Sequence, residues 1–398
     1  MQIKYKNIVL RDYLASDIED DVRWNTVETA WALWDAPWEM EEELAAYNEV
    51  EHREKLQRYL KKSREGHRWA FEADTADGVH IGCVNAYCID DEFNWCETVP
   101  KEDWKSVRWA VGIDIYESAF WSGGWGTQML TAFLKYCIKD GYSDLYTQTW
   151  SGNERMIALA RKLGFRECCR KKELRVVRGE IYDGLTFRLD LAAFCEHCAK
   201  LESIDDDLYL HIPTVEDMWF AEALQSDPDT MAYNAGWDVE YDGYHPDTGC
   251  IDLPSTEWLD RWTYWVGNEP NRFYAFVREK KTGNFVCEVN FHYTTDKNWW
   301  DMGVLVHSSY RGKGYGLKSL VLLTHYAFAV CGIDCLHNDF EETRFAALKI
   351  HKKVGFSDVG ESRILRFGQP VRVIDLMLTK EQYFTAHPEY QKTCDCGS

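Results

Sequence analysis

The sequence repeats itself after about half its length. The run Gly124-Trp125-Gly126 returns as Gly314-Tyr315-Gly316, which is 190 residues later (314 − 124). The run Lys162-Leu163-Gly164-Phe165 returns as Lys353-Val354-Gly355-Phe356, at an offset of 191 residues (353 − 162). Internal similarity at a fixed spacing indicates a repeated structural unit. The chain has 398 residues, so we predict two copies of one fold, each long enough to bury its own core.

Both copies show the same order of predicted elements. A short apolar strand opens each copy, at residues 8–11 and 208–211. Helices and strands then alternate, and a glycine-rich turn joins an apolar strand to an amphipathic helix. This order predicts an α/β or α+β fold. The predicted organisation is a first domain at residues 1–195, a polar linker at 196–207 and a second domain at 208–398.

Charge and composition narrow the possible partners. The formal net charge is −21, which argues against nucleic acid and anionic membranes as partners and suits a cationic partner. No apolar run approaches the length of a membrane span, and the N-terminus lacks the apolar core of a signal peptide. We therefore expect a cytoplasmic protein with reduced cysteines. The pairs Cys168-Cys169 and Cys394–Cys396 lack the spacing of a zinc site, so we predict no metal.

The glycine-rich turns carry the chemistry. The run Arg311-Gly312-Lys313-Gly314-Tyr315-Gly316 follows an apolar strand and precedes a helix. Glycines permit positive φ angles, so successive N–H groups point inward and can bind phosphate oxygens at the start of a helix. The spacing differs from that of a Walker loop and from GxGxxG. We therefore predict a pyrophosphate loop of another kind.

The two turns resemble the pyrophosphate loop of the GNAT superfamily of acetyl-CoA-dependent N-acyltransferases. The resemblance includes the Gly-Phe helix end at Gly164-Phe165 and Gly355-Phe356. The first copy, with Trp121 in place of the leading basic residue and the run from Thr149 to Met156, is similar to the ribosomal-protein N-acetyltransferase-like branch. The resemblance implies two tandem GNAT folds. Each is a mixed, mostly antiparallel sheet with splayed central parallel strands, flanked by helices.

The resemblance also implies an activity and a binding site for acetyl-CoA between the splayed strands. The implied reaction transfers an acetyl group from acetyl-CoA to a primary amine by direct attack. The implied cofactor-binding residues are Val304, Leu305, Val306, Arg311, Gly312, Lys313, Gly314, Tyr315 and Gly316 in the second copy, and Ile113, Ile115, Trp121, Ser122, Gly123, Gly124, Trp125, Gly126, Asn153 and Arg155 in the first.

This reaction needs a base for the ammonium proton and an acid for the leaving thiolate. Many family members carry a tyrosine acid four residues before the glycine of the Gly-Phe end. His351 takes that position in the second copy, and Ala160, which cannot transfer a proton, takes it in the first. Asp301 and Asp114 are the predicted bases. Asp114 stands among apolar strand residues, where an unpaired carboxylate costs free energy.

Two acidic, aromatic segments, 90–104 and 233–245, are the predicted acceptor-binding regions. Carboxylates and aromatic faces suit a cationic small-molecule or peptidic amine, although half-buried loops have the same composition. By contrast, Trp24, Trp31, Trp34 and Trp38 recur near helical spacing and are predicted to be core. A non-catalytic acyl-CoA-binding sensor or interaction module remains the alternative, because Trp121, Ala160 and Arg344 depart from the family pattern. The oligomeric state stays open.

Overall fold

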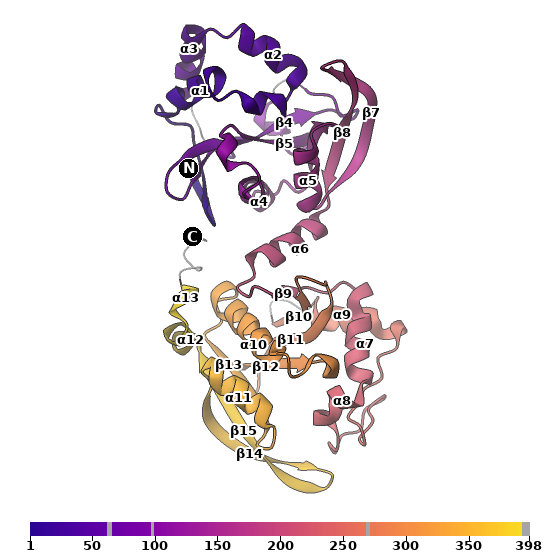
Figure 1. Ribbon diagram of the computed structural model, residues 1–398. Helices are drawn as coiled ribbons and strands as arrows, with labels where there is room; N and C mark the ends of the chain where they lie inside the picture. The colour runs from indigo at the N-terminus through magenta and orange to yellow at the C-terminus, as the bar shows by residue number, and fades with distance from the viewer. Residues whose placement is uncertain (62–65, 97–98, 268–270, 392–398) are drawn as a thin grey trace. The chain divides into compact units, whose positions relative to one another are not determined.

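The computed structural model of the protein describes residues 1–61, 66–96, 99–267 and 271–391. It divides into two compact units, the first being Met1–Cys198 and the second beginning at Ala199 (Figure 1). Helix α6 (Leu191–Glu202) crosses this boundary. Residues 196–202 of the predicted linker therefore form the end of a helix.

The first unit contains an eight-stranded sheet with the order β1-β2-β3-β4-β5-β6-β8-β7. Its strands are β1 (Gln2–Tyr5), β2 (Ile8–Arg11), β3 (Ala70–Thr75), β4 (His80–Ile89), β5 (Arg108–Ile115), β6 (Leu145–Trp150), β7 (Phe165–Val177) and β8 (Glu180–Leu189). Its helices are α1 (Asp17–Thr26), η1 (Ala30–Leu33), α2 (Pro37–Ala45), α3 (Glu49–Leu60), η2 (Lys101–Asp103), η3 (Ser118–Phe120), α4 (Trp125–Lys139) and α5 (Glu154–Lys162), followed by α6.

The second unit contains a seven-stranded sheet with the order β14-β15-β13-β12-β11-β10-β9. Its strands are β9 (Leu208–His211), β10 (Arg272–Glu279), β11 (Phe285–Thr294), β12 (Trp299–Val306), β13 (Cys335–Glu341), β14 (Ser357–Arg366) and β15 (Gln369–Thr379). Its helices are η4 (Glu216–Met218), α7 (Trp219–Ser226), α8 (Pro228–Met231), η5 (Ala232–Asn234), η6 (Ser255–Glu257), α9 (Trp258–Trp265), η7 (Ser308–Tyr310), α10 (Tyr315–His325), η8 (Tyr326–Val330), α11 (Phe345–Val354), α12 (Lys380–Ala386) and α13 (Pro388–Gln391).

Each sheet is mixed and has one parallel pair at its centre, as predicted. The parallel pair β5 and β6 is in register at Trp109–Leu145 and Ala110–Tyr146. The parallel pair β12 and β13 is in register at Asp301–His337. In both pairs the register lies at the start of the strands, although β5 and β12 continue for several more residues. The strand ends therefore diverge and leave a gap in each sheet.

The two sheets share a cross-strand landmark beside this gap. In the first, Asn85 of β4 is the register partner of Gly112 of β5. In the second, Asn290 of β11 is the partner of Gly303 of β12. A Cβ atom at Gly112 would lie 2.8 Å from Asn85 Oδ1, and one at Gly303 would lie 3.0 Å from Asn290 Nδ2. The asparagine side chain would therefore have to shift to admit a Cβ atom at either glycine.

Helices cover both faces of each sheet. In the first unit α4 packs against Ile113 and Ile115 of β5 within the main core, and Trp24 of α1 stacks on Tyr116 with ring centroids 4.4 Å apart. Because side chains alternate along a strand, the even-numbered residues of β5 face away from α4, as does Tyr116, which stacks on α1. In the second unit α10 contributes to the main core, whereas α7 and α9 form a separate cluster that includes Leu305.

Candidate functional site: the glycine turns and the cavity of the first unit

The two glycine turns have the same backbone conformation. Residues 122 and 124 have φ angles of 64° and 80°, and residues 312 and 314 have 77° and 83°. Each turn ends at a left-handed glycine that caps a long helix, Gly124 before α4 and Gly314 before α10. A Cβ atom at either glycine would meet nothing within 4 Å. Both helix N-termini are therefore open, which is the arrangement that binds an anion through backbone N–H groups.

The strand edges next to the gaps carry unpaired backbone groups. The N–H of Tyr116 donates to Ile81 of β4 at 3.0 Å, and backbone groups alternate between the two edges of a strand. The amides of Ile113 and Ile115 therefore face the gap. Trp121 Nε1 donates to the carbonyl of Ile115 at 2.8 Å, which leaves the backbone groups of Ile113 facing the gap.

The same alternation applies to β12. The N–H of His307 donates to Val286 of β11 at 3.2 Å. The amides of Val304 and Val306 therefore face the gap, whereas that of Leu305 faces β11. Of the three residues predicted on this strand, two present their backbone to the gap.

A cavity of about 1050 Å³ occupies the first unit. It runs from the glycine turn, past the end of β5, to the sheet face opposite α4. It is lined by loop residues Trp121, Ser122, Gly124, Gly126 and Thr127, by strand residues Ile113, Asp114, Ile115, Gln148 and Trp150, and by Trp31, Trp34, Asp35, Trp38 and Glu39. The sequence placed Trp31, Trp34 and Trp38 in the core. Only Trp24 of that set is buried; the other three are half-buried because they form one wall of the cavity.

Positive charge gathers at the glycine-turn end of this cavity. The guanidinium of Arg155 lies 4.6 Å from the ring centroid of Trp34 and 4.4 Å from that of Trp121. Lys162 Nζ donates to the Thr127 hydroxyl at 3.2 Å. Trp121 takes the place of a basic residue in the turn, so Arg155 supplies a cation beside it.

Asn153 holds the cavity wall in place. Its Oδ1 accepts from the N–H of Met156 at 3.0 Å and caps α5, and its Nδ2 donates to the Trp34 carbonyl at 2.7 Å. Trp150 Nε1 donates to the same carbonyl at 2.9 Å. Asn153, which the sequence predicted as a cofactor-binding residue, thus has both ends of its amide engaged within the protein.

Carboxylates also line this cavity. Asp114 and Asp35 both line it. Desolvation by the surrounding walls, together with the nearby carboxylate of Asp35, raises the pKa of Asp114 well above its ordinary value. Desolvation and the charges of Glu39 and Glu43 raise the pKa of Asp35 as well. Phe93, Asn94 and Trp95 of the predicted acceptor segment 90–104 also line this cavity. Asp35 was not predicted from the sequence, because its tryptophan neighbours were expected in the core.

The basic residues of the second turn are engaged by their own unit. Arg311 donates to the carbonyls of Asp229 and Thr230 at 2.8 and 3.0 Å. Lys313 Nζ lies 4.9 Å from the ring centroid of Tyr310, and the Tyr315 hydroxyl bonds to Glu279. In this arrangement Arg311 anchors α8 to the turn.

His351 is buried in α11, with 3% of its surface exposed. Its Nδ1–H donates to the Ala347 carbonyl at 2.8 Å, so Nε2 accepts from Asn338 Nδ2 at 2.8 Å. Burial lowers the pKa of His351 to about 4. The ring is thus neutral near pH 7 and carries its single proton on the nitrogen bonded to Ala347. These contacts favour a packing role over that of proton donor, which stays a prediction.

Asp301 lies at the start of β12, where that strand pairs with β13. Its Oδ2 accepts from the Thr294 hydroxyl at 2.6 Å. In the second predicted acceptor segment, 233–245, the ring of Tyr233 lies under the guanidinium of Arg344, 4.7 Å from centroid to Cζ. Arg344 precedes α11 as Asn153 precedes α5, and each contacts an earlier segment of its own unit, at Tyr233 and at Trp34.

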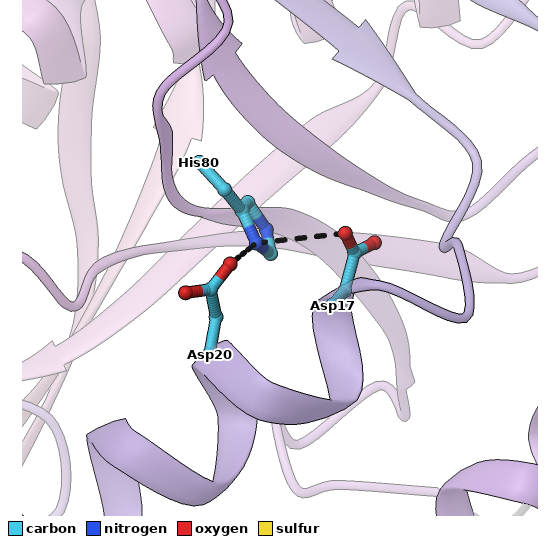
Figure 2. Close-up of side chains that lie close together, drawn as sticks. All are labelled: Asp17, Asp20 and His80. Carbon is cyan, nitrogen blue, oxygen red and sulfur yellow. Dashed lines mark hydrogen bonds and ion pairs between the residues drawn. The ribbon is translucent and has the colours of Figure 1, made fainter.

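Within the described ranges, one group of metal-binding side chains comes together: Asp17, Asp20 and His80 (Figure 2). Asp17 and Asp20 project from α1 toward the ring of His80 on β4, and His80 Nδ1 lies 3.1 Å from Asp20 Oδ2. However, Arg11 binds both oxygens of Asp17, at 2.6 and 3.0 Å, and Glu72 lies 3.2 Å from His80 Nε2.

Burial acts to lower the pKa of His80, but the carboxylates of Glu72 and Asp17 outweigh it, so the pKa is raised. The group is an ion-pair network that fastens α1 to the sheet. Cys195 and Cys198 stand at CxxC spacing on α6, but they do not join such a group among the described residues.

Comparisons with known proteins agree with the geometry. The model of the acetyltransferase (GNAT) domain matches twice, at residues 7–166 and 207–357. No curated protein matches the chain significantly. Among the described residues, no helix combines the length and apolar character needed to cross a membrane.

Two solved structures illustrate the structural neighbours. A GNAT-family acetyltransferase from Bacillus anthracis is 13% identical, with a TM-score of 0.37 over 45% of this chain and 98% of its own. The spermidine N-acetyltransferase from Vibrio cholerae in complex with CoA and spermine is 14% identical, with a TM-score of 0.37 over 45% of this chain and 99% of its own. Because the family model covers most of both units, the chain belongs to the GNAT acetyltransferase family and carries two GNAT domains.

Proposed function

We propose that the protein transfers an acetyl group from acetyl-CoA to the primary amine of a cationic acceptor by direct attack, with the first unit as a catalytic site. One observation carries this proposal. The cavity of the first unit joins an open helix N-terminus to a wall of carboxylates and aromatic rings. An anion-binding turn and carboxylates in one cavity are what a diphosphate-bearing donor and an amine acceptor require.

The residues at the glycine-turn end fit acetyl-CoA. The backbone N–H groups that follow Gly124 would hold the pyrophosphate, where the left-handed glycine leaves open space. Arg155 and Lys162 would add positive charge. The gap-facing backbone groups of Ile113 would hold the pantetheine arm. When bound, acetyl-CoA supplies an acyl carbon activated as a thioester.

The carboxylates of the cavity would receive the amine. Trp31 offers an aromatic ring to a cation, and Asp35 and Asp114 offer carboxylates. The rings of Trp34 and Trp38 already lie against the guanidinium groups of Arg155 and Arg175. Since the pKa of Asp114 is raised, this carboxyl group is suited to accept the ammonium proton near neutral pH, because a general base works best when its pKa lies near the working pH. Asp114 would act as the base, and Asp35 would help to bind and orient the cation.

The test is thiol release from acetyl-CoA against a panel of polyamines, aminoglycosides, amino acids and peptides. We expect turnover with at least one cationic amine, and Asp114→Asn should lower kcat/KM about 100-fold at pH 7 while the binding of acetyl-CoA is kept. Asp144→Asn, at an exposed site that pairs with Arg188, is the matched control. Binding of acetyl-CoA without thiol release across the panel would overturn the proposal in favour of a non-catalytic sensor.

A further inference from the structure

The two units place a single carboxylate at the same point of the sheet, but from opposite strands. Two positions from the asparagine–glycine landmark, Cys83 of β4 is the register partner of Asp114 of β5. At the same point of the second unit, Glu288 of β11 is the partner of Leu305 of β12. The acid has therefore changed strands between the copies, and an uncharged residue stands opposite it each time.

The two carboxylates also share a face of the sheet. Glu288 and Leu305 lie two positions from Asn290 and Gly303, so their side chains point to the same face as that pair. Leu305 packs with the cluster under α7 and α9, away from α10. Asp114 likewise points away from α4. Directly opposed side chains have Cβ atoms about 5 Å apart, so an acid on either strand reaches the same region.

The surroundings of Glu288 keep its carboxylate in one place. It is 8% exposed, and its Oε2 accepts from the Tyr274 hydroxyl of β10 at 2.7 Å. The charge of Arg261 on α9 acts to lower the pKa of Glu288, and the charge of Glu288 in turn raises the pKa of Tyr233 on η5. Asn290, beside Glu288 on β11, donates a hydrogen bond to it. Burial raises the pKa of Glu288, against the opposing effects of Tyr274 and Arg261.

We infer that Glu288 is the proton acceptor of a second acetyl-transfer site in the second unit, in the role proposed for Asp114 in the first. The inference rests on the proposed function of the chain as an acetyltransferase. It replaces Asp301, the base that the sequence predicted. Asp301 lies four residues before Leu305, about 13 Å along the strand, at the end where β12 and β13 are still paired. Glu288 instead lies beside Val304 and Val306, whose backbone groups face the gap.

The reaction balances with Glu288 as base. The acceptor ammonium gives one proton to the Glu288 carboxylate, and the lone pair so released on nitrogen forms the C–N bond to the acyl carbon. The C–S bond breaks, and its electron pair leaves with the coenzyme A sulfur. The second nitrogen proton goes to that sulfur, and Glu288 returns its proton to water. The products are an N-acetyl amine, coenzyme A and one proton.

The experiment uses the full chain and isolates the second unit with Gly124→Glu, which fills the first glycine turn. In this background, Glu288→Gln should lower kcat/KM for the amine found active by the panel about 100-fold, and the acidic limb of the pH–rate profile should disappear. Glu361→Gln, at an exposed site on β14 that pairs with Arg372, is the matched control and should leave both unchanged.

A strand exchange separates a catalytic from a packing role. Glu288→Cys combined with Leu305→Asp gives the second unit the arrangement of the first, and it should restore about tenfold or more of the rate lost in Glu288→Cys alone. A buried group that only packs would not be rescued from the opposite strand. If Glu288→Gln fails to fold, the comparison of the strand exchange with Glu288→Cys alone still tests whether Glu288 is the base.

Three outcomes are distinguishable. Loss with Glu288→Gln and rescue by the exchange support the inference. Turnover in the Gly124→Glu background that is unaffected by Glu288→Gln, or turnover that vanishes in that background while the unaltered protein is active, overturns the inference and leaves the proposed function standing. Absence of turnover in the unaltered protein with every amine overturns the proposed function itself.

Discussion

Ser122 adopts a left-handed backbone conformation that a glycine adopts at the equivalent turn position of the second unit. Its φ angle is 64°, and that of Gly312 is 77°. A non-glycine residue in this region costs about 1–3 kcal/mol, and glycine in turn loses more chain entropy on folding. Ser122→Gly should therefore stabilise the first unit by about 1 kcal/mol.

Denaturant unfolding of Ser122→Gly measures this gain directly. Gly312→Ser is the reciprocal variant, and it should destabilise the second unit by a similar amount. A loss of stability in Ser122→Gly would show that the serine side chain contributes more than its backbone conformation costs.

The buried ring of His351 makes the second unit sensitive to acid. An unfolded histidine takes up a proton near pH 6.5, whereas the folded ring does so near pH 4. Between these values the unfolded state binds more protons, so stability falls as the pH falls from about 6.5 to 4, by about 3 kcal/mol in all. Above pH 6.5 this contribution is constant.

Unfolding free energies at pH 7 and pH 4.5 test the linkage. His351→Phe should reduce the pH dependence of the second unit, although it loses the hydrogen bonds to Asn338 and Ala347. His245→Phe, at an exposed ring, is the control. An unchanged dependence of the unfolding free energy on pH in His351→Phe would show that the ring is not held neutral in the folded state.

The same variant tests the catalytic role predicted for His351, because a normal turnover rate at pH 7 would remove His351 from the mechanism.

At the scale of elements, one amide connects helix α5 to the loop that lines the cavity. Asn153 caps α5 and binds the Trp34 carbonyl. Asn153→Ala should cost about 1–2 kcal/mol of stability, since a lost N-cap alone costs about 1 kcal/mol. It should also raise the KM for the amine, because the wall formed by Trp34 and Asp35 loses its anchor.

Asn48→Ala is the matched control for this prediction. Asn48 caps α3 by accepting from the N–H groups of Val50 and Glu51, and neither it nor α3 lines the cavity. It should lower stability by a similar amount and leave the KM unchanged. Equal KM values for Asn153→Ala and the unaltered protein would separate the loop anchor from acceptor binding.

For the whole molecule, the repeated turn predicts two acetyl-CoA sites in one chain. Titration calorimetry should give two sites for the unaltered protein, one for Gly124→Glu, one for Gly314→Glu and none for the double variant. In each case a glutamate side chain would place negative charge where the pyrophosphate binds, in addition to the strain of the left-handed conformation.

The controls carry the same strain in other turns. Gly179 and Gly368 join strands in their own units, at φ angles of 86° and 70°, and have open space around them. Gly179→Glu and Gly368→Glu should retain both sites. A single site in the unaltered protein, lost in only one of the two turn variants, would mean that the other unit does not bind acetyl-CoA.

Much of the architecture follows from local features of the sequence. The repeated runs around Gly124 and Gly314 and around Gly164 and Gly355 predicted two copies, because a left-handed position that caps a helix favours glycine. The alternation of apolar residues predicted the strands and helices, and the family resemblance implied the splayed strands. The structure shows two mixed sheets with flanking helices and the same turn conformation in both units.

The chemistry of the sites depended on contacts between distant segments. Arg311 was predicted at the pyrophosphate loop, yet its side chain reaches the carbonyls of Asp229 and Thr230, some 80 positions earlier in the chain. Asp35 and Asp114 share a cavity only because η1 and β5 meet in the fold. Glu288 stands opposite Leu305, the counterpart of Asp114, only because β11 and β12 pair in this register. Side-chain periodicity sets which residues share a face, but the pairing of strands and the packing of loops set which carboxylates meet, and local sequence patterns do not reveal these long-range contacts.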